Sequence, residues 1–173
     1  MPQTIRPATP ADLSAISRIY DHAVRQGTAS FEVEPPDQAE MARRYRALLE
    51  GGYPYLVAER DGAVAGYAYA GAYRTRPAYR WTVEDSIYVD PAASRQGIGR
   101  ALLDRLIAEC TACDFRQMIA VIGDSAQTAS IELHRAAGFR LVGTIENVGF
   151  KFGRWLDSVI MQRALGKGAT SAP

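Results

Sequence analysis

The segment 94–101, Ser-Arg-Gln-Gly-Ile-Gly-Arg-Ala, carries the strongest chemical signal in this sequence. Gly97 and Gly99 let the backbone approach a ligand closely, and the N–H groups of the loop and of the helical turn that follows then point at an anion such as a pyrophosphate. The G-x-G-x-x-G spacing of a dinucleotide loop and the Gly-Lys-Ser/Thr of a P-loop are absent. From its residues alone, the segment is equally compatible with a plain glycine cap on a helix.

Glu84 lies mid-strand inside the apolar run 81–89, with Asp85 and Ser86 beside it. A carboxylate at such a position is either solvated on the open face of a half-buried strand or used in chemistry. An α-ammonium group has a pKa near 8, so roughly a quarter is free amine at pH 7.5, whereas a lysine near 10.4 is only about 0.1% free. A single carboxylate base is therefore adequate for an α-amine and poorly matched to a lysine.

Arginines 74, 76 and 80 flank Tyr73 and Tyr79 just before that run. A guanidinium group matches a carboxylate with two parallel hydrogen bonds. The segment is thus either a carboxylate-binding loop or a solvated basic loop.

The cysteines and histidines do not predict a metal site. Cys110 and Cys113 form a lone C-x-x-C at the end of a predicted helix, with neither His22 nor His134 close in sequence. We expect two reduced thiols and no bound metal.

Hydrophobic periodicity predicts how these residues are positioned. Strand-like runs cover residues 4–7, 55–59, 64–73, 81–89, 118–122, 140–148 and 158–162. Helix-like runs begin at Thr9-Pro10, cover 37–49, follow the glycine loop around 101–107, and cover 125–137. A mixed α/β (α+β) sheet with helices on both faces accommodates this order.

The bulk composition fits one domain, which we place at 1–165, followed by a small polar tail at 166–173 that we expect to be disordered. The chain has 173 residues, 47% hydrophobic and 23% charged, with a net charge of +1. That charge gives no reason to expect nucleic acid or an anionic membrane as a partner. Without a signal-like start or a run of ~20 apolar residues, we expect a cytoplasmic protein.

The motifs taken together resemble a known family. Ile-Tyr-Val-Asp-Pro at 87–91, followed by Arg-Gln-Gly-Ile-Gly-Arg-Ala-Leu-Leu at 95–103, is similar to the acetyl-CoA motif of the GNAT acetyltransferases. Segments 28–32, 79–84, 129–134 and 148–157 resemble, more narrowly, the phosphinothricin and methionine sulfone/sulfoximine N-acetyltransferases. The resemblance spans about residues 5–165. It departs at Ser94, where the family usually has Gln or Arg, and at Gln127, where it usually has Asn.

The resemblance implies a mixed, mostly antiparallel sheet of about seven strands and a set of site residues. Acetyl-CoA would be held by Ile87, Tyr88, Val89, Arg95, Gln96, Gly97, Ile98, Gly99, Arg100, Gln127 and Ser130. The amino-acid-like substrate would be bound by Phe31, Arg74, Thr75, Arg76, Glu84, Asp85 and Ser86. Glu84 would act as general base. His134, at the place of a common tyrosine general acid, would either donate a proton or only pack beside acetyl-CoA.

The activity that this resemblance implies is direct transfer of the acetyl group to the α-amine of a small amino acid, by a homodimer. A backbone N–H near residues 87–89 would polarise the thioester carbonyl. Two alternatives remain open. One is a protein N-terminal or peptide acetyltransferase, and the other is a non-catalytic acyl-CoA sensor.

Overall fold

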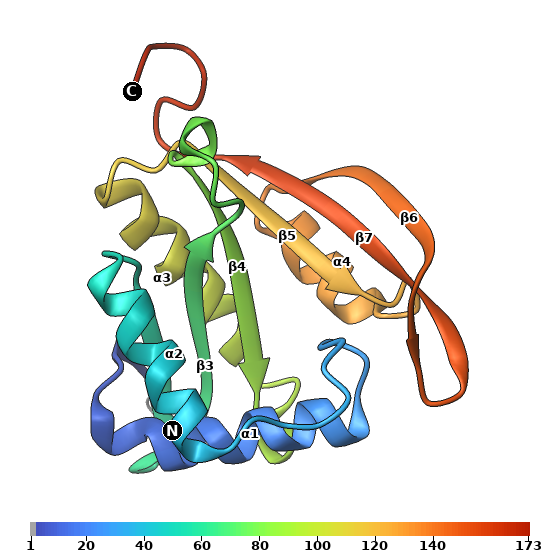
Figure 1. Ribbon diagram of the computed structural model, residues 1–173. Helices are drawn as coiled ribbons and strands as arrows, with labels where there is room; N and C mark the ends of the chain where they lie inside the picture. The colour runs from blue at the N-terminus through green and yellow to red at the C-terminus, as the bar shows by residue number, and fades with distance from the viewer. Residues whose placement is uncertain (1–2) are drawn as a thin grey trace.

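The computed structural model describes residues 3–173 and contains a seven-stranded sheet in the order β1-β2-β3-β4-β5-β7-β6 (Figure 1). The strands are β1 (Gln3–Pro7), β2 (Tyr55–Arg60), β3 (Ala63–Ala72), β4 (Thr82–Val89), β5 (Gln117–Gly123), β6 (Arg140–Lys151) and β7 (Arg154–Ala164). Only the β4–β5 pair is parallel among the strand pairs of these residues. The predicted mixed, mostly antiparallel sheet is confirmed. Met1 and Pro2 of the predicted domain lie outside the described residues.

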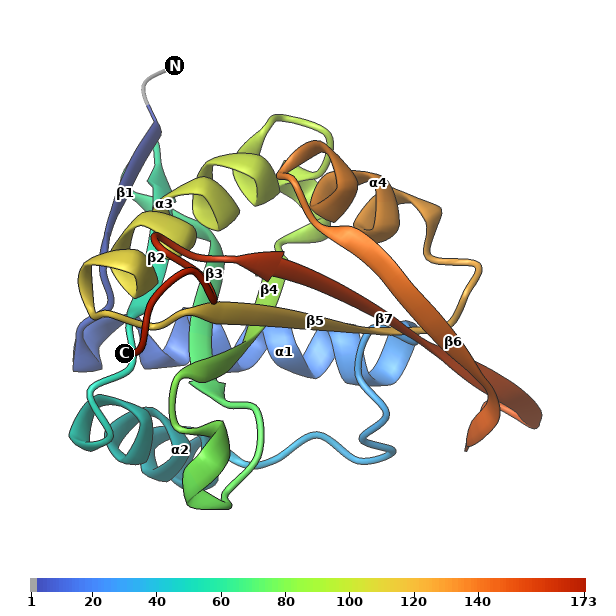
Figure 2. The same ribbon diagram turned by 90° about the horizontal axis from the view of Figure 1, so that it is seen from above.

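Helices cover both faces of the sheet, as predicted. The helices α1 (Leu13–Gln26) and α2 (Gln38–Glu50) lie on one face, and α3 (Ile98–Ala112) and α4 (Thr128–Ala136) lie on the other (Figure 2). Because successive strand residues point to opposite faces, β3 sends Tyr67 into the core under α1 and α2 and Ala68 into the core under α3. The same alternation in β4 decides which face each site residue can reach.

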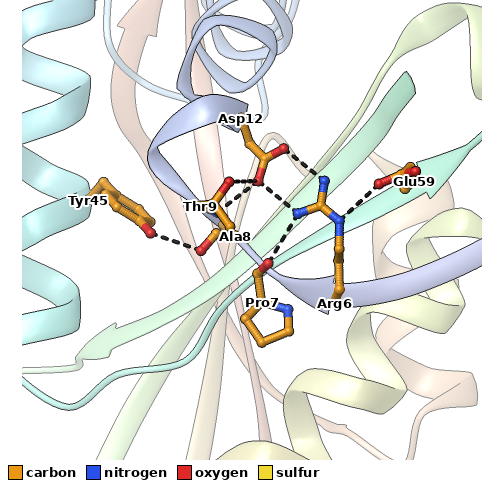
Figure 3. Close-up of polar contacts among 7 residues, drawn as sticks. All are labelled: Arg6, Pro7, Ala8, Thr9, Asp12, Tyr45 and Glu59. Atoms are coloured by element: carbon orange, nitrogen blue, oxygen red, sulfur yellow. Dashed lines mark hydrogen bonds and ion pairs between the residues drawn. The ribbon is translucent and has the colours of Figure 1, made fainter. Parts of the chain in front are cut away.

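The entry to the first helix differs from its prediction. A short 3₁₀ turn, η1 (Pro10–Asp12), precedes α1, so the α-helix begins at Leu13. The Asp12 carboxylate accepts a hydrogen bond from the Thr9 N–H at 2.7 Å and pairs with Arg6 at 2.8 Å (Figure 3). These contacts fix the turn before the helix starts.

Two other boundaries differ from their predictions. The helix expected at 125–137 begins only at Thr128, because the Asp124 side chain accepts from the Ala126 N–H and turns the chain first. The last two strands are longer than predicted and form one hairpin, closed by Phe152 and Gly153 with φ of 53° and 72°. A two-residue turn with both φ values positive matches the twist of a hairpin, but phenylalanine there is no sequence signal for it.

The tail at 166–173 turns back toward the start of β5. Arg116 donates to the Gly168 carbonyl, the Ser171 hydroxyl and the Ala172 carbonyl.

Among residues 3–173, none of the helices has the combined length and apolar character that a membrane crossing requires. Within the same residues, His, Cys, Asp and Glu side chains form no group of three or more that could hold a metal ion.

Candidate active site

The parallel strands β4 and β5 separate partway along their length (Figure 1). They pair only where Thr82–Asp85 faces Gln117–Ala120. Beyond that point β4 continues along β3 and β5 continues along β7. A cavity of about 590 Å³ lies in the resulting gap.

The cavity is lined by most of the residues predicted for acetyl-CoA. These are Ile87, Tyr88, Val89, Arg95, Gly97, Ile98, Gly99, Arg100, Gln127 and Ser130. Asp85, Ser86 and His134, predicted for the substrate or for catalysis, line the same cavity. Sequence reasoning missed nine other lining residues, because most of them are small or apolar and carry no recognisable chemical signal. They are Ala29, Ala93, Ser94, Ala120, Val121, Ile122, Gly123, Ala129 and Leu133.

The glycine loop at one end of the cavity has the geometry of an anion site. Gly97 is the residue before α3 and has φ of 80°, and Arg95 has φ of 61°, so both lie in the left-handed region. The first intrahelical bond of α3 is made by the Ala101 N–H, to Gly97. The N–H groups of the three preceding residues therefore face outward at the positive end of the helix dipole. This arrangement fits the pyrophosphate of acetyl-CoA.

Two residues predicted to bind acetyl-CoA have other partners. Gln96 does not line the cavity, and its side chain accepts a hydrogen bond from Arg60 at the end of β2. Gln127 lines the cavity, but its Nε2 donates to the Thr28 hydroxyl at 3.1 Å. The side chain of Gln127 therefore links the cavity wall to the loop after α1.

Glu84 and Asp85 project from opposite faces of β4. Asp85 reaches α4, where its Oδ2 lies 2.9 Å from His134 Nε2. Glu84 shares the other face with Tyr88, which packs edge-on against Tyr20 of α1. Glu84 is half-buried and does not line the main cavity. Burial raises the pKa of Glu84, the negative charge of Asp85 raises it further, and the positive charge of Arg74 partly offsets both.

The predicted substrate residues outside β4 are not part of the cavity lining. Arg74, Thr75 and Arg76 are exposed between β3 and β4, and they do not line the cavity. The Arg74 guanidinium lies 5.2 Å from the centre of the Tyr73 ring, and its charge acts on Glu84. Phe31 is 38% exposed, and its ring packs against the backbone at Gly123 and Gly149.

A buried clamp that the sequence did not reveal holds the loop after α1. Lys151, at the end of β6, is almost fully buried and donates to the carbonyls of Gly27 and Ser30 at 2.9 and 2.8 Å. The Thr28 hydroxyl donates to Asp124 at 3.0 Å. The loop that carries Ala29 and Phe31 is thereby fixed beside the cavity.

A glycine loop and a helix N-terminus beside a gap between two parallel strands are the features that the resemblance to acetyl-CoA-dependent transferases predicts. The chain matches the acetyltransferase (GNAT) domain family over residues 5–160 and belongs to that family. It is an N-acetyltransferase that uses acetyl-CoA.

Three known proteins place it within the family. The chain is 56% identical over 170 residues to the phosphinothricin N-acetyltransferase of Alcaligenes faecalis, covering 98% of this chain and 86% of that protein. It is 44% identical to the L-methionine sulfoximine/L-methionine sulfone acetyltransferase of Salmonella typhimurium, covering 96% of each. Its structure superposes with a TM-score of 0.97 on a GNAT superfamily phosphinothricin acetyltransferase from Sinorhizobium meliloti in complex with acetyl-CoA, at 53% identity, covering 100% of this chain and 94% of that one.

Proposed function

We propose that this enzyme transfers the acetyl group of acetyl-CoA to the α-amine of amino acids of the phosphinothricin, methionine sulfone and methionine sulfoximine type. The observation that carries the proposal is the 56% and 44% identity, over nearly the whole chain, to enzymes named for these substrates. The charge of Arg74 acts on Glu84, and this supports the proposal, since Glu84 can accept an amine proton and Arg74 can bind a carboxylate.

Backbone geometry supplies a group for the thioester carbonyl. The Asp90 N–H donates to Ala65 across the β3–β4 pair. Because N–H directions alternate along an antiparallel strand, the N–H groups of Tyr88 and Ser86 also face β3, and those of Ile87 and Val89 face the gap. These two are fixed donors for the oxygen that gains negative charge when the amine attacks.

The amine reaches this carbonyl from the Glu84 side of the sheet. At pH 7.5 roughly a quarter of an α-amine with a pKa near 8 is already unprotonated. Glu84, directly or through one water, accepts the proton that the amine nitrogen loses as the C–N bond forms. The acetyl group passes directly from sulfur to nitrogen, with no acyl-enzyme.

The arginine segment gives the test of substrate class. Arg74→Ala should raise the KM for methionine sulfone roughly ten- to hundredfold, because a charged hydrogen bond is worth about 1.5–3 kcal/mol. The KM for acetyl-CoA should stay nearly unchanged. The control variant Arg46→Ala, which removes an exposed arginine of α2, should change neither KM. Assays of coenzyme A release measure both KM values.

A comparison of substrates tests the same point without mutation. The decarboxylated amine of methionine sulfone should be turned over far more slowly than methionine sulfone. Equal turnover of the two would mean that no carboxylate is recognised, and a peptide acetyltransferase would become the better assignment.

We also propose a homodimer, formed through the β6–β7 hairpin. This hairpin exposes seven large apolar side chains: Leu141, Val142, Ile145, Val148, Phe150, Phe152 and Trp155. It also projects from the body of the molecule, and β6 is an edge strand (Figure 1). A patch of this kind marks an interface. Sedimentation should show a dimer that Phe150→Asp converts to monomer, whereas Val33→Asp, which changes an exposed valine outside the hairpin, should not.

A further inference from the structure

A second, smaller cavity lies on the face of the sheet that α1 and α2 cover. Its volume is about 30 Å³, and it is lined by four tyrosines (Tyr20, Tyr55, Tyr67 and Tyr69), by Arg44 and by two apolar side chains of α2. Since about 10–15 Å³ of such volume admits one water molecule, this cavity has room for a small polar group but not for a whole amino acid. Its polar wall consists of phenol and guanidinium groups, which can all donate hydrogen bonds.

Two of the tyrosine hydroxyls are donors that the protein leaves unpaired. Tyr55 and Tyr67 are 5% and 1% exposed, and within residues 3–173 neither hydroxyl has a hydrogen-bond partner. Their oxygens are also not fully enclosed by protein atoms. Buried polar groups are nearly always paired, so these hydroxyls indicate a cavity that accommodates a polar group. Burial raises the pKa of Tyr69, and its hydroxyl therefore stays protonated and able to donate.

Arg44 of α2 brings a guanidinium group to the same cavity. Its Nε pairs with Glu40 at 2.8 Å, and its Nη1 pairs with Glu32 at 2.5 Å. The third nitrogen, Nη2, makes no hydrogen bond to any of the described residues, although it carries two hydrogens. The two carboxylates fix the orientation of the guanidinium group and leave Nη2 available to a ligand.

The strand register places the second cavity one step away from Glu84. In the β3–β4 pair Glu84 lies opposite Gly71, and Tyr69 is two residues before Gly71 on the same face. Two residues along a strand span about 6.7 Å. The charges of Glu84 and Arg44 both act on Tyr69. Arg74 lies on the opposite side of Glu84, beyond the end of β3. The groups therefore follow one another from Arg74 past Glu84 to Tyr69 and Arg44.

We propose that the second cavity is the side-chain subsite for the amino acid, where Tyr69 and Arg44 donate hydrogen bonds to the oxygens of a sulfone, sulfoximine or phosphinate group. The proposal rests on the proposed acetyl transfer. With the amine at Glu84 and the carboxylate at Arg74, the side chain is the remaining large group on Cα, and it extends along β3 toward Tyr69. A thioether sulfur is only a weak acceptor, so the subsite selects side chains that carry oxygens.

A comparison of two substrates tests the subsite. Methionine sulfone and methionine share the amine, the carboxylate and the carbon chain, and they differ in the sulfone oxygens. In the parent, kcat/KM should favour the sulfone. Tyr69→Phe should reduce that preference roughly fivefold and Arg44→Met roughly tenfold or more, because each removes a donor to the sulfone. The loss should appear in the KM for the sulfone, with kcat/KM for methionine and the KM for acetyl-CoA within about twofold of the parent.

Two matched controls separate recognition of the sulfone from a general effect on packing. Tyr45→Phe removes a hydroxyl from the same group of tyrosines, but this hydroxyl donates to the Ala8 carbonyl and does not line the cavity. Arg43→Met removes the neighbouring arginine, which also pairs with Glu40. Neither variant should change the preference for the sulfone over methionine.

The outcomes separate this proposal from the proposed function. A parent that acetylates both amino acids equally well would refute the subsite and leave the enzyme an acetyltransferase. The same conclusion follows if Tyr69→Phe or Arg44→Met keeps the preference of the parent, or lowers activity on both substrates equally. Tyr69→Phe conserves the ring and keeps the test decisive if Arg44→Met does not fold. If the parent acetylates neither amino acid, the proposed function fails, and the subsite fails with it.

Discussion

Glu84 and Asp85 are neighbours in sequence, yet β4 assigns them to opposite faces of the sheet. Strand alternation alone produces this separation, because adjacent side chains point about 180° apart. Asp85, predicted to bind substrate, lines the cavity and pairs with His134. Glu84 remains on the side of Arg74 and the tyrosines under α1 and α2. One short strand thus presents a carboxylate to each face of the sheet.

The role proposed for Glu84 predicts a pH-dependent loss of activity in Glu84→Gln. We expect kcat/KM to fall about a hundredfold near pH 6.5, where the amine is mostly protonated, and much less near pH 9. In the parent, the acid limb should lie above the ordinary carboxyl range, because burial and Asp85 raise the pKa of Glu84 and a protonated Glu84 is not a base. The pH profile of coenzyme A release measures both. Glu50→Gln, at an exposed position of α2, serves as control. An equal loss at every pH would show that Glu84 only positions the substrate.

At the scale of elements, we predict that the N-terminus of α3 carries the affinity for acetyl-CoA. Gly99→Asp should weaken binding roughly a hundredfold, since a like charge about 4 Å from a phosphate costs up to ~4 kcal/mol near a protein surface. Gly99→Ala should bind nearly normally, because a Cβ there would meet Leu133 and Val89 at 3.4 and 3.7 Å, ordinary contact distances. Calorimetric titration of both variants checks the prediction. Unchanged affinity in a folded Gly99→Asp would contradict the assignment of the loop.

The ends of β5 and β6 fix the loop after α1. Lys151 contacts this loop from β6, Asp124 contacts it just after β5, and Phe31 lies against glycines of both strands. Any larger residue at Gly123 would meet the Thr28 carbonyl at 2.5 Å. The position of this loop beside the cavity is therefore determined by strands far away in sequence.

At the scale of the whole molecule, Asp12 links β1 to the start of α1 (Figure 3). The hydrogen bonds from Arg6 lower the pKa of Asp12 to about 2, from 3.8 in an unfolded chain. A lowered carboxyl pKa stabilises the fold at every pH above the unfolded value, and this contribution disappears as the pH falls toward 2. Asp12→Asn should therefore lower the free energy of unfolding by about 2 kcal/mol at pH 7 and by much less near pH 2.

Urea denaturation at several pH values measures this difference. The exposed pair broken in Asp21→Asn should contribute less than ~1 kcal/mol at any pH. A pH-independent loss of unfolding free energy in Asp12→Asn would mean that Asp12 stabilises the fold through its hydrogen bonds in the turn before α1 and not through its charge.

The sequence determined the local features of this protein. Hydrophobic periodicity predicted the seven strands and the four helices, and the predicted helix ends lie within a few residues of the observed ones. The glycines at 97 and 99 were compatible with an anion site or a plain helix cap, and the resemblance carried by several short motifs added the role of Glu84 as a base. These signals are readable because a helix cap, a strand face or a glycine turn depends on residues within one or two turns of the chain.

Only the tertiary structure decided which distant residues meet. Asp85 and His134 are separated by 49 residues, and Lys151 and Ser30 by 121. Their contacts depend on where β5 diverges from β4 while it stays paired with β7, because this divergence opens the cavity. Strand order and register come from the packing of the whole sheet, and no short segment of sequence specifies them.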